Sequence, residues 1–127
     1  MLKTSQRYQS VQITTASPGE LLVTMFDGLL RFLNVARMGL ANGRRAQAGE
    51  AIGKAHSILT ELSVSLDHSH APELCANLHA LYDFGMSRLT QANLKSDPLI
   101  IDEVIRVLAP IREAFTTVVR SGAGATK

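Results

Sequence analysis

Four side chains whose atoms can bind metals lie close together in the chain: His68, His70, Cys75 and His79. Cys75 and His79 are four residues apart and would share a face if this stretch is helical. A structural metal site normally includes a tighter pair, such as two cysteines separated by two residues. We therefore expect a partly buried thiol beside solvated histidines, and the sequence predicts neither a metal site nor a cofactor.

His56 could carry a different chemistry, phosphoryl transfer. Histidine phosphotransfer domains use an exposed histidine on the second helix of a four-helix bundle, and residues 55–59 superficially resemble that helix. In those domains the histidine is followed by Lys and Gly, which help steady the phosphoryl group, whereas this chain has Leu59 and Thr60. Phosphotransfer through His56 remains an alternative function at this point.

Two carboxylates, Asp27 and Asp83, each directly follow an aromatic residue in a segment with helical apolar spacing. They could form an acid/base pair if the fold brought them together. The structural interpretation is that each pairs with a neighbouring base, such as Arg31 or Arg88. The sequence holds no phosphate-binding glycine loop, no nucleophile elbow and no HExxH zinc motif, so we predict that the protein is not an enzyme.

The elements that would position these side chains are helices, as the composition indicates. Leu (17) and Ala (15) are abundant in the 127 residues, Gly (9) and Pro (4) are few, and Trp is absent. This balance favours helices over a sandwich or barrel of short strands. The net charge of +2 is too small for a nucleic-acid surface, and the lone cysteine fits a reducing compartment. The polar first residues and the lack of a long apolar run predict a cytoplasmic protein without membrane insertion.

Start and stop signals divide the chain into four helices. Ser17 is a capping residue, Pro18 takes the first helical position, and Glu20 completes a capping box. We predict helices over 18–40, 45–66, 72–95 and 98–120, with Asp97 as the cap of the last helix and a kink at Pro110. The fold class is therefore all-α. An antiparallel four-helix bundle over 17–120 would carry an extended or loosely ordered N-terminal arm, 1–16, and a flexible tail, 121–127.

The first helix carries two apolar stripes where a bundle helix needs one. One stripe consists of Leu22, Phe26, Leu29, Leu33, Ala36 and Leu40, and the second of Leu21, Met25, Gly28, Phe32 and Val35. In the last helix, Ile100 and Val107 lie off the main stripe. The extra surface could be a wide core, a homodimer contact in a helical scaffold, or a groove for another polypeptide with the arm around Tyr8, Val11 and Ile13 as its lid.

A set of short motifs lies in order between about Tyr8 and Phe115. They are Tyr8, residues 15–21 and 25–28, Lys54-Ala55 with Ile58, Glu61-Leu62 and Leu66-Asp67, residues 77–84, Arg88-Leu89 with Ala92-Asn93, and residues 112–115. Their order and spacing together are more specific than any one motif. In these motifs the chain resembles a known family, the flagellin-specific export chaperones of bacterial flagella (FliS).

The resemblance implies a cytosolic bundle that binds the disordered C-terminal segment of new flagellin. Such a chaperone prevents premature polymerisation and keeps its client competent for flagellar type III secretion, in contact with export apparatus components or a co-chaperone. It also implies that the arm covers part of the client groove. Three residues depart from the family pattern: Phe26 replaces a common Tyr, Phe115 replaces a frequent Trp, and Pro110 is unexpected.

The expected client-binding residues come from the apolar pattern and from the resemblance. Tyr8 and Ile13 represent the arm, and Tyr82 and Asn93 are carried over by motif. The groove-lining candidates from the extra stripes are Leu21, Met25, Phe32, Ile100 and Val107. Leu22, Phe26, Leu78 and Leu81 are expected in the core.

Overall fold

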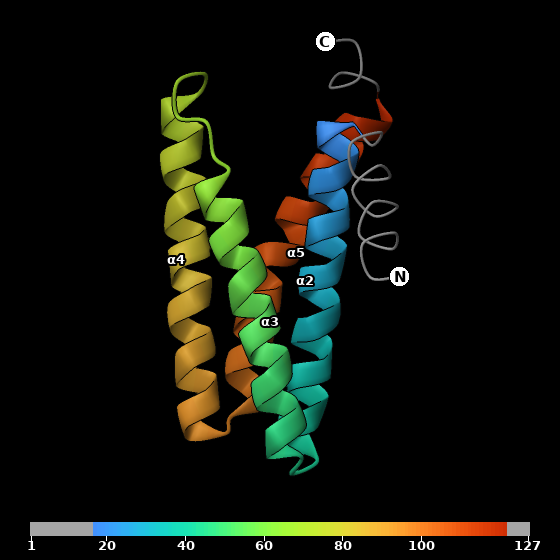
Figure 1. Cartoon of the computed structure of the whole chain (residues 1–127), viewed down its shortest axis with the longest axis vertical. Helices are drawn as coiled ribbons and strands as arrows, with labels where there is room; N and C mark the ends of the chain where they lie inside the picture. Colours follow the sequence, from blue (N-terminus) through green and yellow to red (C-terminus); the bar gives the residue numbers. More distant parts are fainter. Residues whose placement is uncertain (1–16, 122–127) are drawn as a thin grey trace, which may run out of the picture.

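The described part of the chain folds as four long helices that run alternately up and down (Figure 1). The structure, a computed structural model, describes residues 17–121. Its helices are α2 (Pro18–Ala41), α3 (Arg45–Val64), α4 (Pro72–Lys95) and α5 (Pro98–Arg120). Helices α2 and α4 each pack against both α3 and α5, so the four form a closed ring. The described residues contain no strand, and the predicted all-α four-helix bundle is confirmed.

Capping side chains fix where two of the helices begin. The Ser17 Oγ accepts a hydrogen bond from the Glu20 amide at 3.1 Å, and Pro18 starts α2 as predicted. The Asp97 carboxylate accepts a bond from the Leu99 amide at 2.9 Å, and Pro98 starts α5. Proline suits this first position because its missing N–H would have no partner inside the helix.

The ends of the other helices are less sharply encoded. Helix α3 follows Arg44, whose side chain makes no capping bond, and it ends at Val64, two residues before the predicted end. Helix α4 ends at Lys95, as predicted, and is followed by Ser96, which caps it in a left-handed conformation with φ 51°. Helix α5 continues past Pro110 to Arg120, so the proline does not end it.

The core lies between the four helices, and leucine is its most frequent residue. The largest fully buried side chains are Tyr82, Phe26, Leu29, Leu33, Leu59, Leu62, Leu89, Ile101, Leu108 and Val104. Five of the six residues predicted for the first stripe of α2 are buried, and Leu22 is partly buried against the core. This stripe is therefore the core face of the helix.

The first and last described residues lie at the same end of the bundle. Residues 17 and 121 lie at the end that also holds the α3–α4 loop, while the α2–α3 and α4–α5 turns lie at the other end (Figure 1). The predicted arm and all of the predicted tail except Ser121 fall outside the described residues. Within the described range, none of the helices has the length and apolar character needed to cross a bilayer.

Candidate functional site

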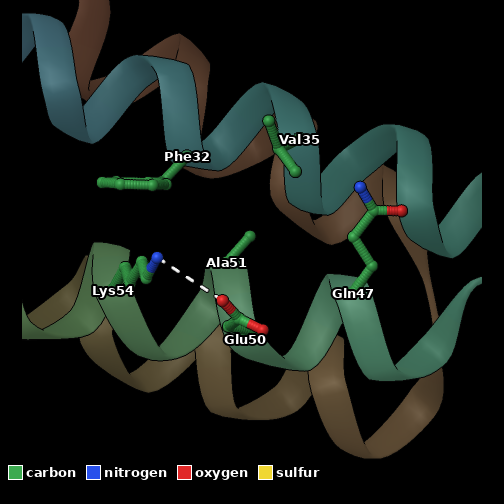
Figure 2. A pocket seen from close by; sticks show the side chains of 6 residues that line it. All are labelled: Phe32, Val35, Gln47, Glu50, Ala51 and Lys54. Carbon is green, nitrogen blue, oxygen red and sulfur yellow. Dashed lines mark ion pairs between the residues drawn. The ribbon is translucent and has the colours of Figure 1, made fainter.

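The second stripe of α2 faces the outer edge of α3 and opens there into a hollow. Phe32 and Val35 of α2 line one side of a cavity of about 300 Å³. Its other side is formed by four residues of α3, namely Gln47, Glu50, Ala51 and Lys54 (Figure 2). Figure 2 shows Phe32 and Lys54 at one end of this hollow and Gln47 at the other.

A second hollow of about 130 Å³ continues the first toward the α2–α3 turn. Val35 and Gln47 line both hollows, so the two join along the same pair of helices. The further residues of the second hollow are Met38, Gly39, Asn42 and Arg44. We call the combined surface the α2–α3 groove. From Phe32 to Asn42 it spans about 15 Å, at the helical rise of 1.5 Å per residue.

Small residues make the floor of the groove. An added Cβ at Gly39 would lie 3.0 Å from the Ala48 Cβ, so the two helices are in close contact there. Ala51 is only 4% exposed. Larger apolar side chains stand beside this floor on the α2 side, since Val35 is 36% and Met38 59% exposed. The groove is therefore apolar at its base and along one wall, and it is open to solvent.

Charged side chains surround the Phe32 end of the groove. The Lys54 ammonium lies 5.4 Å from the centre of the Phe32 ring, and the Arg31 guanidinium lies 5.5 Å from it. Lys54 also forms an exposed ion pair with Glu50 at 3.4 Å, drawn in Figure 2. A cation over an aromatic face is attracted by the ring quadrupole. These contacts place positive charge directly beside an apolar surface.

The predicted client-binding residues do not gather in one place. Phe32 lines the α2–α3 groove, while Leu21 and Met25 lie partly buried on the same stripe of α2. Val107 is partly buried on α5. Asn93 is exposed at the α3–α4 edge, where its backbone oxygen accepts a bond from Arg45 at 3.1 Å. Tyr8 and Ile13 lie outside the described residues.

Two of the predicted residues are core residues, which corrects their assignment to a binding surface. Tyr82 is 1% and Ile100 5% exposed, so a client on the surface of this structure reaches neither. The Tyr82 ring lies 6.3 Å from that of Phe26, which in turn lies 5.5 Å from the Phe115 ring. Burial raises the pKa of Tyr82 to about 12, so its hydroxyl stays neutral at physiological pH. Tyr82 supports the aromatic part of the core.

The two candidate acid/base carboxylates have different partners, and neither is the one predicted. Asp27 accepts a bond from the Arg112 Nε at 2.8 Å, and Asp83 lies 3.3 Å from the His79 Nδ1. Arg88 instead pairs with Glu103 at 2.7 Å. The contacts with Asp27 and Glu113 raise the pKa of the Arg112 guanidinium above its ordinary value. Asp27 therefore joins α2 to α5 and is not part of a carboxylate pair.

The Asp27–Arg112 contact lies in another hollow, of about 330 Å³, between the start of α2 and the end of α5. Its remaining lining residues are Glu20, Val23, Thr24, Thr116, Val119 and Arg120. Charges of both signs are mixed there with small polar groups. This composition gives the hollow less apolar surface for a protein partner than the α2–α3 groove.

The region around the α3–α4 loop holds the cysteine and three of the histidines. The Cys75 thiol is buried and donates to the Asp67 backbone oxygen at 3.3 Å. Hydrogen bonds from Ser69 lower the pKa of Asp67, and His70 lies 3.3 Å from its carboxylate. Between residues 17 and 121, no three His, Cys, Asp or Glu side chains come together as a metal site would require. The fourth histidine, His56, is exposed on α3.

Sequence reasoning missed most of the wall that α3 contributes. Phe32 and Val35 were identified by their spacing, but Gln47, Glu50 and Lys54 are polar and carry no apolar periodicity. Met38 was also missed, although it is one of the most exposed large apolar side chains of the described residues. It follows Val35 by three residues, so extending the second stripe by one more position could have found it.

Comparison with known proteins identifies the relatives of this chain. Residues 1–122 match the family described as flagellar protein FliS. The chain is 39% identical over 104 residues to the flagellar secretion chaperone FliS of Salmonella typhimurium, with 81% of this chain and 77% of the relative covered. It is 33% identical over 114 residues to that of Bacillus subtilis, with 90% and 84% covered.

Two further comparisons agree with these. The flagellar secretion chaperone FliSB of Pseudomonas aeruginosa is 31% identical over 118 residues, which cover 90% of this chain and 94% of the relative. A crystal structure of a bacterial flagellar chaperone superposes with a TM-score of 0.77 at 18% identity, covering 94% of this chain and 98% of that one. At that identity the likeness concerns the fold.

Proposed function

The chain belongs to the FliS family of flagellar secretion chaperones, and from this membership we propose that its client is flagellin. In this proposal the bundle binds the disordered C-terminal segment of new flagellin in the cytoplasm. It prevents premature polymerisation and delivers the subunit in a form that the flagellar type III secretion apparatus accepts. The family is one of chaperones and not of enzymes, so the chemistry of the site is binding alone.

The α2–α3 groove is the observation that carries this proposal. A disordered segment that folds on binding needs apolar surface on its partner to compensate for its loss of conformational entropy. Phe32, Val35 and Met38 provide such surface in a row along α2, with Ala51 of α3 beside them. Their spacing along a helix suits a second helix lying in the groove.

The energetic balance indicates that the groove is only part of the binding surface. Complete burial of a Phe, Val or Met side chain contributes about 1.5–3 kcal/mol. Less than that is available here, because Phe32 is already partly buried and Val35 and Met38 are only 36% and 59% exposed. Ordering a segment that folds on binding costs about 2–5 kcal/mol or more. A client confined to the groove would therefore bind weakly.

Further exposed apolar side chains lie outside the groove and extend the available surface. Phe84 of α4 is 39% exposed, Leu99 of α5 is 68% exposed, and Val118 of α5 is 48% exposed. A client that also covers these positions must pass around several helices. This distribution supports a long segment that wraps the bundle in place of a short peptide bound at one spot.

Calorimetric titration with a flagellin peptide tests the proposed function. The full chain is titrated with a synthetic peptide of about the last 40 residues of flagellin from the same organism, a length that allows coupled folding. We expect saturable 1:1 binding with a negative heat-capacity change. Absence of both heat and co-elution, with the bundle shown to be helical, would contradict flagellin as the client.

The N-terminal arm enters the proposal through the sequence alone. We infer that residues 1–16, with Tyr8 and Ile13, compete with part of the client. Deletion of residues 1–14 is then expected to leave the bundle folded and to change client affinity in the same titration. Loss of the helical circular dichroism signal would instead make the arm a structural element.

Contacts with export apparatus components or a co-chaperone, and a homodimer, belong to the proposal as well. Pull-down and light scattering at several concentrations test these contacts.

A further inference from the structure

We propose that the α2–α3 groove is selective for an acidic amphipathic helix, supplied by the C-terminal segment of the client. This inference rests on the proposed function and specifies which chemistry one of its surfaces recognises. The occupant is a helix of about three turns, the length that matches a groove of about 15 Å. Its apolar side chains face the groove floor, and its carboxylates face the cations at the edge.

The groove runs along α2 and α3 and offers no backbone edge with which an extended strand could pair, so it suits a helical occupant. The lining residues Phe32, Val35, Gly39 and Asn42 recur every three or four positions, which is the spacing of one helical face. The residues of α3 show the same spacing in the opposite direction, because the two helices are antiparallel. A third helix lying along two others buries residues at i, i+3 or i+4, and i+7. The groove is lined by side chains throughout and presents no free strand edge.

The charge around the groove favours an acidic occupant. Three cationic side chains lie along it, Arg31, Arg44 and Lys54, against the single carboxylate of Glu50. Within residues 17–121, neither Arg31 nor Arg44 forms an ion pair with a carboxylate. Complementary potentials raise the association rate and select among partners.

Lys54 is the side chain that would respond most directly to an incoming carboxylate. It already lies over the Phe32 ring, so a carboxylate that reaches it stands beside the apolar floor. Its pair with Glu50 at 3.4 Å is exposed on both sides, and exposed pairs of this kind are weak. Lys54 is therefore free to exchange Glu50 for a carboxylate of the client at little cost.

The same charges argue against two other occupants, a second copy and the arm. In a symmetric dimer built on this groove, Arg31, Arg44 and Lys54 would face the identical set of the second copy, and like charges repel. Residues 1–16 contain Lys3 and Arg7 and no Asp or Glu. An arm with only positive charge does not complement a positive groove, so its inferred competition with the client concerns other parts of the binding surface. The client segment is thus the occupant to which the groove is suited.

Four variants of the full chain test this inference with the flagellin peptide described above. Met38→Glu and Lys54→Glu place a carboxylate in the groove and at its edge. Leu94→Glu and Lys95→Glu are their matched controls on α4, where Leu94 is 72% exposed. All four positions lie on exposed helix surface, and far-UV circular dichroism with urea unfolding establishes that each variant is folded.

We expect both groove variants to weaken peptide binding at least about tenfold, because each brings an unpaired charge against the client. The two controls are expected to stay within about twofold of the wild type, as exposed surface changes do. A second peptide has all its Asp and Glu residues replaced by Asn and Gln. We expect it to bind the wild type more weakly than the original peptide, and we expect Lys54→Glu to weaken its binding no further. This non-additivity identifies a direct pair between Lys54 and a client carboxylate.

The outcomes separate this inference from the function on which it rests. If the wild type does not bind the peptide at all, the proposed function fails. If the wild type binds and Met38→Glu and Lys54→Glu bind equally well, the function stands and the groove is not the helix site. Equal losses for the groove variants and their α4 controls would also overturn the inference. So would a dimer in light scattering that only Met38→Glu dissociates, since the groove would then hold a second copy.

Discussion

Replacing Gly39 with alanine tests whether the close contact between α2 and α3 determines the stability of the bundle. A Cβ at this position would lie 3.0 Å from the Ala48 Cβ and 3.2 Å from both the backbone N and the Cα of Ala48. The nearest atoms belong largely to the helix backbone and cannot rotate away. The two helices must therefore move apart by a few tenths of an ångström to accept one methyl group.

The size of the effect follows from two opposing terms. Alanine is preferred over glycine inside a helix by about 1 kcal/mol, which favours the variant. Overpacking a tight contact costs about 1–3 kcal/mol, which opposes it. Gly53→Ala isolates the first term, because a Cβ at that exposed position of α3 meets no atom within 4 Å. We expect Gly53→Ala to stabilise the protein, and Gly39→Ala to be less stable than Gly53→Ala by about 1–3 kcal/mol.

Urea unfolding followed by far-UV circular dichroism measures this difference. The two variants can be compared if their unfolding free energies fall equally steeply with urea concentration, because equal slopes show that their unfolded states are alike. Gly49→Ala serves as a second control, since its nearest neighbour would be the Asn93 Oδ1 at an ordinary 3.9 Å. Equal stabilisation by all three substitutions would show that the α2–α3 contact relaxes freely, and the reasoning would be wrong.

Three other substitutions test the core and a strained turn. Ser96→Gly should raise the unfolding free energy by about 1 kcal/mol, because Ser96 has φ 51° and its buried hydroxyl has no partner within residues 17–121; a lower melting temperature would contradict this. Leu33→Ala should lower the unfolding free energy, measured with urea, by about 2–5 kcal/mol because Leu33 is fully buried. Leu94→Ala, at an exposed position, should change it by less than about 0.5 kcal/mol, and similar losses for the two variants would refute the assigned core. Burial raises the pKa of Tyr82 from 10.0 to about 12. The neutral hydroxyl therefore contributes fully to the unfolding free energy below pH 10.0, and this contribution is lost as the pH rises toward 12. Tyr82→Phe should remove this part of the pH dependence, and unchanged dependence would show that Tyr82 does not cause it.

Local signals in the sequence accounted for the helix starts that carry capping residues. Ser17 with Pro18, and Asp97 with Pro98, satisfy backbone groups within one turn, so the information lies entirely in neighbouring residues. Helix α3 begins after Arg44 without such a bond, and its end was misplaced by two residues. Leu66 follows the apolar spacing and packs on the core, yet it lies beyond the helix. Apolar spacing thus continues past the point where the backbone leaves the helix.

The candidate site was only partly predictable because it depends on how the helices face one another. The second stripe of α2 marked Phe32 as extra apolar surface, and Phe32 does line a groove. The same argument placed Ile100 on the surface, but α5 turns it inward. The partner of Asp27 is Arg112, 85 positions away, which no local pattern reveals. Which side of a stripe is covered is decided by the packing of four helices at once.

The ring of helices contains one interface that differs from the rest in sequence separation, and this has a consequence for folding kinetics. Three of the four interfaces join helices connected by short turns, whereas the α2–α5 interface joins the first and last described helices through Asp27–Arg112 and Arg37–Asp102. Closing the longest loop costs the most chain entropy, so we expect this interface to form after the others. Substitutions there should accelerate unfolding while leaving the folding rate nearly unchanged. The bundle would then open first between α2 and α5, while the three interfaces between helices adjacent in sequence remain intact.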